Sequence, residues 1–348
     1  MRFALTPEQE AFRDTARRFL SERVDLRATI DRTGAHDPAL WKAIASLGWF
    51  GVDVPVELAG QGLTFVEVAL LAEETGRALL PGPFLETLLA VQALLVAGSD
   101  QQRADHLPSL VAGERPTAAV RGAGISLLSD RLRGEDRAVP CAEVAELFLV
   151  AAAVPDGMTP FLVNRDQVTV EPAQGADLTR PIARVVLDRA KYLERLDARR
   201  FAGLVDRARV IVAAELAGAA SRALEMAVAY AMDRQQFGRP IGEFQAVKHR
   251  AADSWRAAEA ARLAVWYAAW AIANDAPDAS VAASAAKAAA GDAALKCTAD
   301  SIQIHGGIGF TWEHDAHLYY RRAIAGQAAL GDSSVHREAL AADVFSRA

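Results

Sequence analysis

Three side chains between residues 233 and 250 are of types that bind an anion and a flat ring. In the segment DRQQFGRPIGEFQAVKHR, a helix is expected to stop near Phe237 and Gly238, turn through residues 239–242 and restart before Gln245. That turn would bring the guanidinium of Arg234, the ring of Phe237 and the amide of Gln245 to one corner, where they could grip a phosphate and stack on a ring. The alternative is that Arg234 is a surface charge and Phe237 a core residue.

A second candidate site is the glycine cluster in QIHGGIGFTWEHD, residues 303–315, which follows a predicted helix. Without a Cβ at Gly306, Gly307 and Gly309, the backbone can approach a ligand closely, and successive N–H groups can cup a phosphate. The alternative is that the glycines only end the helix. Neither motif is specific when it is taken alone.

The elements that must position these motifs follow from two changes in the character of the chain. Residues 1 to about 115 have helical periodicity, and the first helix is predicted to begin with Thr6 as N-cap and Pro7 at its first position. From residue 116 to about 196, short apolar runs such as AELFLVAAAV alternate with turn residues, which predicts a small β-domain. From about residue 200, long Ala-rich helices favour an antiparallel bundle. The predicted class is α+β, mostly α.

Composition excludes several classes of function. The 348 residues are 52% hydrophobic and carry a net charge of −6, so a large core is possible and no basic face indicates nucleic acid or an anionic membrane. The two cysteines, Cys141 and Cys297, fit neither a disulfide framework nor a metal site. We expect no signal peptide, since the start has no basic region followed by an apolar run, and no membrane span. A cytoplasmic location is therefore expected.

The two motifs, in this order around a helical bundle, resemble the acyl-CoA dehydrogenase family. The resemblance covers nearly the whole chain, through LTPEQ, LGWFGVDVPVELAGQGLTFVEVALLAEETGRAL, RQQFGRPIGEFQAVKHRAAD and QIHGGIGFTWEHDAHLYYRRA. It implies an N-terminal helical domain (1–115), a central small β-barrel domain (116–196) and a C-terminal four-helix bundle (197–348). It also implies FAD bound between the subunits of a dimer or tetramer.

The resemblance assigns roles to individual residues. Two positions, Asp206 and Arg209, match those that lie beside the CoA arm of the thioester in relatives. A larger set matches positions that hold the adenine and pyrophosphate of FAD belonging to a neighbouring subunit: Arg234, Phe237, Gln245, Gln303, Gly306 and Gly307.

The family's reaction needs a carboxylate that removes the α-proton of an acyl-CoA, and this chain lacks one at both family positions. The usual position corresponds to Leu330, and the alternative position, just before Arg209, is Ala208. Asp332 is a weak substitute, because in a helix two residues turn a side chain to the opposite side. Glu215 more simply satisfies bundle packing or a neighbouring arginine.

The predicted β-domain also departs from relatives that hold their own flavin. After its first strand the sequence reads TAAVRGAGISLLSD in place of a Thr-Glu-Pro…Gly-Ser-Asp stretch, and Ala138 and Pro140 replace the residues of a Trp-x-Thr motif. The chain therefore resembles the non-catalytic subunit of actinobacterial heteromeric (α2β2) acyl-CoA dehydrogenases, in which a partner supplies the flavin cradle and the catalytic Glu.

The implied substrate is an acyl-CoA, with a bulky steroid side chain as one hypothesis, and the implied electron acceptor is electron-transfer flavoprotein. Two alternatives stay open. One is a self-sufficient homo-oligomeric dehydrogenase that uses Asp332 or an unrecognised base. The other is a non-enzymatic scaffold of the same fold.

Overall fold

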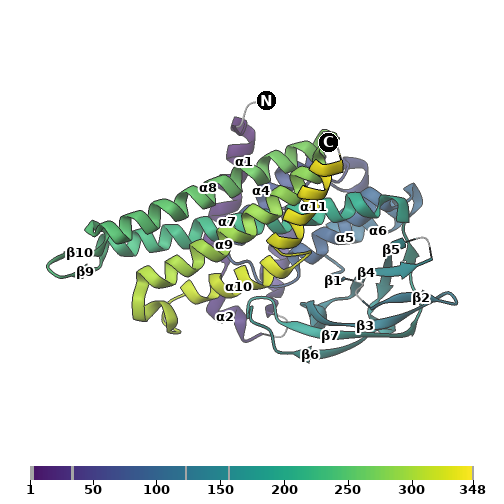
Figure 1. The fold of residues 1–348 in the computed structure, drawn as a ribbon. Helices are drawn as coiled ribbons and strands as arrows, with labels where there is room; N and C mark the ends of the chain where they lie inside the picture. The colour runs from purple at the N-terminus through teal and green to yellow at the C-terminus, as the bar shows by residue number, and fades with distance from the viewer. Residues whose placement is uncertain (1–3, 33–34, 122–123, 156, 347–348) are drawn as a thin grey trace. The chain divides into compact units, whose positions relative to one another are not determined.

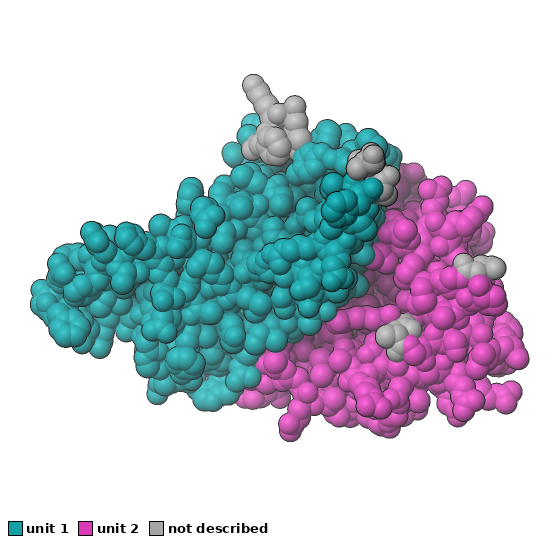
Figure 2. Space-filling model, in the orientation of Figure 1, with its two compact units in different colours: residues 1–22, 65–80, 206–348 teal, residues 23–64, 81–205 magenta. Residues whose placement is uncertain are grey.

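The computed structural model describes residues 4–32, 35–121, 124–155 and 157–346. It divides the chain into two compact units, coloured separately in Figure 2. Unit 1 contains residues 1–22, 65–80 and 206–348, and unit 2 contains residues 23–64 and 81–205. Each unit is therefore assembled from segments that are distant in the sequence.

Unit 1 is helical. Its helices, in chain order, are α1 (Pro7–Arg23), α4 (Phe65–Arg77), most of α7 (Phe201–Asp233), α8 (Gln245–Ala273), α9 (Ala279–His305), α10 (Ala316–Ala328) and α11 (Ser333–Ser346). A two-stranded hairpin, β9 (Gln235–Gln236) and β10 (Arg239–Pro240), and the short helix η7 (Ile241–Glu243) connect α7 to α8. The short helix η8 (Gly306–Phe310) follows α9. In Figure 1, α8 and α9 run side by side along this bundle.

The start of α1 confirms the predicted cap. The Thr6 hydroxyl accepts a hydrogen bond from the Gln9 backbone N–H at 3.3 Å, and the Gln9 side chain accepts one from the Thr6 N–H at 3.1 Å. This reciprocal pair satisfies two backbone donors that a helix start otherwise leaves open. Pro7 occupies the first helical position, where its missing N–H costs nothing.

Helices α4 and α7 cross with their backbones in contact. A methyl group added to Gly76 would lie 2.0 Å from the Glu215 carbonyl oxygen, and one added to Gly218 would lie 1.9 Å from the Glu73 carbonyl oxygen. Only glycine allows so close an approach. Two glycines thus fix the spacing of these two helices.

Unit 2 combines short helices with a sheet. Its helices are α2 (Leu26–Ile30), α3 (Pro38–Ser46), α5 (Phe84–Ala97) and α6 (Asp100–Val111). Its strands are β1 (Thr117–Val120), β2 (Ser126–Leu128), β3 (Arg131–Pro140), β4 (Leu147–Val154), β5 (Gly157–Asn164), β6 (Thr169–Ala173), β7 (Ile182–Ala190) and β8 (Glu194–Arg195). The 3-10 helices η2 (Trp49–Gly51), η3 (Val56–Leu58), η4 (Ala142–Val144), η5 (Arg165–Gln167) and η6 (Ala198–Arg200) complete it.

The eight strands form one mixed sheet with the order β6-β7-β3-β2-β4-β5-β8, and β1 pairs with β4 in parallel. One apolar cluster, which includes Phe148 and Phe161, lies on the sheet. A second cluster packs Leu147, Leu149 and Leu162 against α5 and α6. Successive residues of β4 thus belong alternately to the two clusters, because successive side chains of a strand point to opposite faces of the sheet and both faces are buried here.

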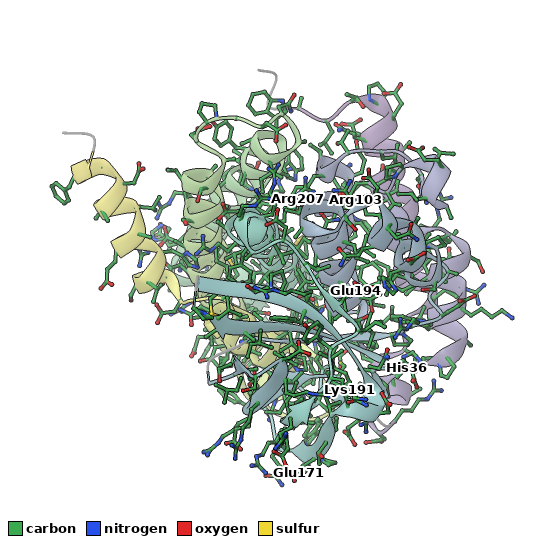
Figure 3. The ribbon with its side chains drawn as sticks, turned by 90° about the vertical axis from the view of Figure 1, so that its right-hand side faces the viewer. His36, Arg103, Glu171, Lys191, Glu194 and Arg207 are labelled. Carbon is green, nitrogen blue, oxygen red and sulfur yellow. The ribbon has the colours of Figure 1, made fainter. Side chains whose placement is uncertain are left out.

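Polar contacts also join the last strand of the sheet to α6. The carboxylate of Glu194 in β8, which Figure 3 labels, accepts a hydrogen bond from the Gln102 side chain at 2.7 Å. Its other oxygen lies 3.1 Å from His106 Nε2. The capping box of α6 includes Gln102, so one side chain serves both the helix start and the strand.

The structure confirms the predicted fold class: the chain is mostly helical, with a central sheet and long C-terminal helices. The predicted division at residues 115 and 196 remains a prediction. In the structure, α1 and α4 group with the C-terminal helices, because Arg17 and Trp266 hydrogen-bond to Glu74 and Glu73 of α4. None of the helices within the described ranges is long and apolar enough to cross a lipid bilayer.

Candidate functional site

Arg234, Phe237 and Gln245 lie around the hairpin that follows α7. The Arg234 carbonyl accepts a hydrogen bond from the Ile241 N–H at 2.8 Å, which closes the hairpin. Phe237 and Gly238 form its two-residue turn with φ angles of 55° and 77°, as in the mirror-image turns that hairpins favour. The Phe237 ring is 92% exposed and meets Phe244 edge-on at 6.2 Å. The interpretation of Phe237 as a core residue was wrong.

Gln303, Gly306 and Gly307 lie where α9 ends. Gly306 has φ 65° and ψ −137°, a backbone conformation that is essentially restricted to glycine. Gly306 and Gly307 both face open space, because a Cβ built on either would meet no atom within 4 Å. Gln303 is exposed one turn earlier on α9. The turn therefore presents bare backbone to the exterior of this chain.

The structure brings these two motifs to the same end of the bundle. Ala227 and Ala231 of α7 and Ile304 of α9 share one apolar cluster, against which Ile241 and Val247 pack. The rings of Tyr230 and His305 are 4.6 Å apart. Since the residues just before Arg234 contact those just before Gly306, the two motifs form one corner of unit 1.

Asp206 and Arg209 form an ion pair one turn apart on α7, at 2.8 Å. Another guanidinium nitrogen of Arg209, Nε, is buried and has no hydrogen-bond partner among the described residues. A buried donor without a partner costs about 1–3 kcal/mol, unless a water or a ligand accepts its hydrogen bond.

Leu330, at the family's usual base position, lies in the connection between α10 and α11. It is half-buried and has a left-handed φ of 59°, and the next residue, Gly331, has φ 95°. A left-handed leucine is strained and persists only where its surroundings hold it.

Two residues that the sequence motifs did not reveal hold this connection. The buried Lys287 of α9 donates hydrogen bonds to the Gln327 carbonyl at 2.9 Å and to the Gly331 carbonyl at 3.0 Å. His336 of α11 is buried and packs beside Gly331, and within the described part of the chain neither of its ring nitrogens has a hydrogen-bond partner of normal geometry. The only sequence signal was a lysine, Lys287, surrounded by alanines in the middle of a helix.

The carboxylates considered as substitute bases are engaged elsewhere. Residues 329–332 are not helical, and Asp332 caps α11 by accepting hydrogen bonds from the N–H groups of Ser334 at 2.9 Å and Val335 at 3.1 Å. Glu215 is 1% exposed and bonds to Arg322 at 2.6 Å, as expected for a packing role. Ala208, at the alternative family position, is buried and offers no acceptor.

In unit 2, Ala138 and Pro140 end β3, where the resemblance would place a flavin cradle. Asp136 accepts hydrogen bonds from the backbone N–H groups of Arg121 and Ala138, each at 3.1 Å. One carboxylate thus joins the end of β1 to β3, the two places from which cradle residues would extend. The stretch after β1 includes residues 122–123, which lie outside the described residues.

We expect acidification to destabilise the chain through its buried histidine His336. Burial, followed by the positive charges of Arg209 and Lys287, lowers the pKa of His336 below the value of about 6.5 for a free histidine. A histidine whose pKa is lower in the folded than in the unfolded state makes its full contribution to the free energy of unfolding above about pH 6.5. This contribution is lost as the pH falls through the pKa of the folded state. The urea concentration at the midpoint of unfolding should therefore decrease as the pH is lowered from about 7.5 to about 5.5.

The control is His336→Leu, which removes the titrating group from the buried site. Its stability should depend less steeply on pH over the same interval, although His305, whose pKa burial also lowers, leaves some slope. An unchanged slope would mean that His336 does not titrate in this range.

Comparison with known proteins gives a consistent result. Residues 6–114 match the family described as "Acyl-CoA dehydrogenase, N-terminal domain", and residues 199–345 match "Acyl-CoA dehydrogenase, C-terminal domain". The chain is 34% identical to acyl-CoA dehydrogenase IpdE2 of Mycolicibacterium smegmatis, over 98% of this chain and 100% of that one. It is 35% identical to IpdE2 of Mycobacterium tuberculosis, over 92% of each.

Solved structures agree with the sequence relatives. A chain of the ChsE4-ChsE5 complex from Mycobacterium tuberculosis superposes with a TM-score of 0.92 at 26% identity, and 99% of each chain is covered. A variant of the Tcur3481-Tcur3483 steroid ACAD gives a TM-score of 0.90 at 30% identity, with 98% of each covered. The chain belongs to the acyl-CoA dehydrogenase family of flavin-dependent oxidoreductases, whose cofactor is FAD.

Proposed function

We propose that this chain is the subunit of a heteromeric acyl-CoA dehydrogenase that lacks the catalytic base and binds one end of a flavin held by its partner. The observation that carries the proposal is a contrast within unit 1. Leucine occupies the base position, whereas an exposed arginine, an exposed aromatic ring and an open glycine turn remain at one corner.

The corner fits the adenine and pyrophosphate end of FAD. The guanidinium of Arg234 supplies charged donors for a phosphate oxygen, and the Gly306 and Gly307 backbone supplies N–H groups that no Cβ obstructs. Phe237, nearly fully exposed, presents a face on which adenine can stack. Gln245 and Gln303 add side-chain amide groups at the edge of this corner.

The remainder of the chain does not fit the flavin ring or the proton transfer. When bound, FAD would supply the hydride acceptor of the family's reaction, and a carboxylate would have to take the α-proton of the acyl chain. Leu330 cannot accept a proton, Asp332 caps a helix, and neither Ala138 nor Pro140 offers the groups of the family's cradle. We therefore assign the flavin cradle and the base to a partner subunit of the same family.

Substrate and partners follow from the relatives. Two of the similar structures, ChsE4-ChsE5 and Tcur3481-Tcur3483, are named after two proteins each. The second is described as a steroid ACAD. We extend the two-protein assembly and the steroid substrate to this chain. The proposed enzyme is a heterotetramer that acts on a bulky acyl-CoA, such as the CoA thioester of a steroid side chain. Electron-transfer flavoprotein as electron acceptor and a cytoplasmic location complete the proposal. The Asp206 and Arg209 pair would lie beside the CoA arm of the thioester.

The first test compares the purified chain alone with the chain co-expressed with a dehydrogenase encoded by a neighbouring gene. We expect the chain alone to be colourless and inactive, and the complex to contain one flavin per heterodimer and to oxidise acyl-CoA. A stoichiometric flavin and turnover in the chain alone would instead establish the self-sufficient alternative. A stable complex without flavin would favour the scaffold.

The second test is Asp332→Asn in the complex. Asparagine caps a helix as well as aspartate does but cannot serve as a base, so folding should be preserved. We expect turnover to stay within about twofold of the unmodified complex, whereas loss of a true catalytic base costs about 10²-fold or more. A loss of that size in Asp332→Asn would place the base on this chain.

A further inference from the structure

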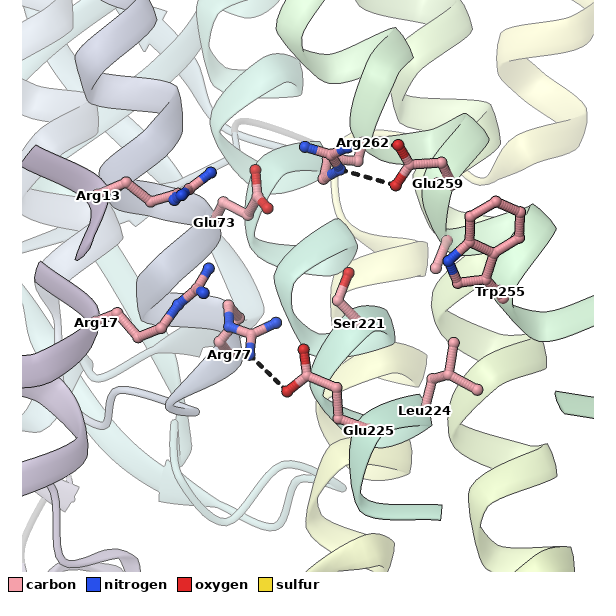
Figure 4. A pocket seen from close by; sticks show the side chains of 11 residues that line it. Arg13, Arg17, Glu73, Arg77, Ser221, Leu224, Glu225, Trp255, Glu259 and Arg262 are labelled. Atoms are coloured by element: carbon pink, nitrogen blue, oxygen red, sulfur yellow. Dashed lines mark hydrogen bonds and ion pairs between the residues drawn. The ribbon is translucent and has the colours of Figure 1, made fainter. Parts of the chain in front are cut away.

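A cavity of about 250 Å³ lies within unit 1 between α1, α4, α7 and α8 (Figure 4). None of the residues discussed above for flavin or thioester binding lines it. Since a water molecule occupies about 30 Å³ in the liquid, the cavity has room for about eight waters or for one small organic molecule. Four arginines line it: Arg13 and Arg17 from α1, Arg77 from α4 and Arg262 from α8.

Two of these guanidinium groups are neutralised within the cavity wall. Arg77 bonds to Glu225 at 2.6 Å, and Arg262 bonds to Glu259 through Nε at 3.0 Å. Figure 4 shows both pairs as dashed lines. These pairs leave little uncompensated charge on the α7 and α8 side of the cavity.

The two arginines of α1 are engaged differently. Arg17 forms a bidentate pair with the buried Glu74, at 2.9 Å and 2.7 Å, so its charge is also compensated. Among the described residues, Arg13 bonds only to Asp14, the next residue of its own helix, whose side chain is 59% exposed and therefore screened by solvent. In Figure 4 the Arg13 side chain extends from α1 toward Glu73. One positive charge thus faces the cavity with only a weak counter-charge.

Glu73 provides the polar group at the back of the cavity. It is 3% exposed, and one of its oxygens accepts a hydrogen bond from Trp266 Nε1 at 2.9 Å. Burial raises the pKa of Glu73, and the hydrogen bond from Trp266 partly offsets this rise. The negative charge of Glu74 raises the pKa further, while Arg262 and Arg77 lower it. A protonated Glu73 can donate a hydrogen bond to an acceptor in the cavity.

We propose that this cavity binds a small monocarboxylate, with its carboxylate between Arg13 and Glu73 and its hydrocarbon part against Leu224, Ala258 and Trp255. A single negative charge matches the guanidinium of Arg13, whose counter-charge is the weakest of the four. A phosphate dianion would instead leave excess negative charge beside Glu225 and Glu259. The apolar wall and the indole of Trp255, 62% exposed at the mouth, suit a hydrocarbon or aromatic group.

The proposal implies proton uptake on binding. Beside a bound carboxylate, Glu73 carries its proton, so affinity is highest at low pH and falls as the pH rises above the pKa of Glu73 in the free protein. The charged and titratable groups that surround it come from all four helices: Arg13 and Arg17 on α1, Glu74 and Arg77 on α4, Glu225 on α7, and Glu259 and Arg262 on α8. Burial raises the pKa of Glu73, whereas the hydrogen bond from Arg77 lowers the pKa of Glu225 despite its partial burial.

Titration calorimetry of the full chain with sodium benzoate tests the site, with benzamide as the uncharged probe of the same shape and inorganic phosphate as the dianion. We expect saturable benzoate binding and at least tenfold weaker binding of both other probes. Arg13→Gln should weaken benzoate binding at least tenfold. Arg18→Gln, the same charge change on the same helix but outside the cavity, should leave it unchanged.

The variant Glu73→Gln distinguishes benzoate binding in this cavity from a nonspecific attraction of benzoate to arginine side chains. Glutamine keeps a donor beside the ligand but does not titrate, so benzoate should still bind, with an affinity that no longer changes with pH. Circular dichroism confirms that each variant is folded. Equal affinity for benzoate and benzamide, no benzoate binding to the folded chain, or an unchanged pH dependence in Glu73→Gln would each overturn the proposal.

Discussion

Replacing Arg322 by methionine should destabilise unit 1 by about 3–5 kcal/mol, since it removes the positive charge that pairs with the buried carboxylate of Glu215. Arg322 and Glu215 are each 1% exposed, and the guanidinium bonds to Glu215 at 2.6 Å and to the Leu80 carbonyl at 3.3 Å. This one side chain therefore ties α10 to α7 and to the end of the α4 segment. Urea unfolding followed by circular dichroism measures the loss.

The double variant Arg322→Met with Glu215→Leu is the decisive control. It removes both charges and refills the space with apolar atoms, and such exchanges are often neutral or stabilising, so it should recover most of the lost stability. Arg337→Met breaks a solvent-exposed pair with Asp292 and should cost no more than about 1 kcal/mol. If the double variant were as unstable as the single one, packing around Arg322 rather than charge would be the cause.

The second large effect concerns the glycine turn and depends on the proposed function. In the chain itself, a side chain at Gly307 would meet no atom within 4 Å, and its φ is not in the left-handed region. Gly307→Val should therefore leave the unfolding of the isolated chain unchanged. In the heteromer, however, the added methyl groups would occupy the space through which the flavin diphosphate approaches the backbone. We expect the complex to bind FAD at least about tenfold more weakly, which corresponds to about 1.4 kcal/mol.

Fluorescence titration of the flavin-depleted complex with FAD measures this effect. Ala260→Val, which introduces the same side chain at an exposed position of α8, should leave FAD affinity unchanged. Equal FAD affinity in Gly307→Val and in the unmodified complex would show that no diphosphate approaches this turn.

Local signals predicted much of the fold. The start of α1 was predictable because Thr6, Pro7 and Gln9 act within one turn. The β-domain followed from apolar runs such as that of β4, whose residues alternate between two clusters. The grouping of α1 and α4 with the C-terminal helices was not predictable. It depends on contacts such as that of Arg17 with Glu74 and of Trp266 with Glu73, whose partners are far apart in the sequence.

The candidate site was predictable to the extent that it depends on residue type. The absence of a carboxylate at position 330 is visible in the sequence, and so are the glycines that follow α9. The groups that hold the loop were not visible. Lys287 acts on carbonyls about forty positions later in the chain, and Asp332 acts through the backbone of the helix that follows it. Both roles depend on backbone geometry that residue types alone do not specify.

The crossing of α4 and α7 limits which residues its two glycine positions can accept. Peptide groups rather than side chains are in contact there, so even alanine at Gly76 or Gly218 would force the helices apart or distort them. Neither glycine is among the residues that we assign to flavin or thioester binding. A saturation mutagenesis screen that selects for a functional protein should nevertheless report that both positions tolerate no substitution. The cause would be the close approach of two helix backbones, and not a role in catalysis.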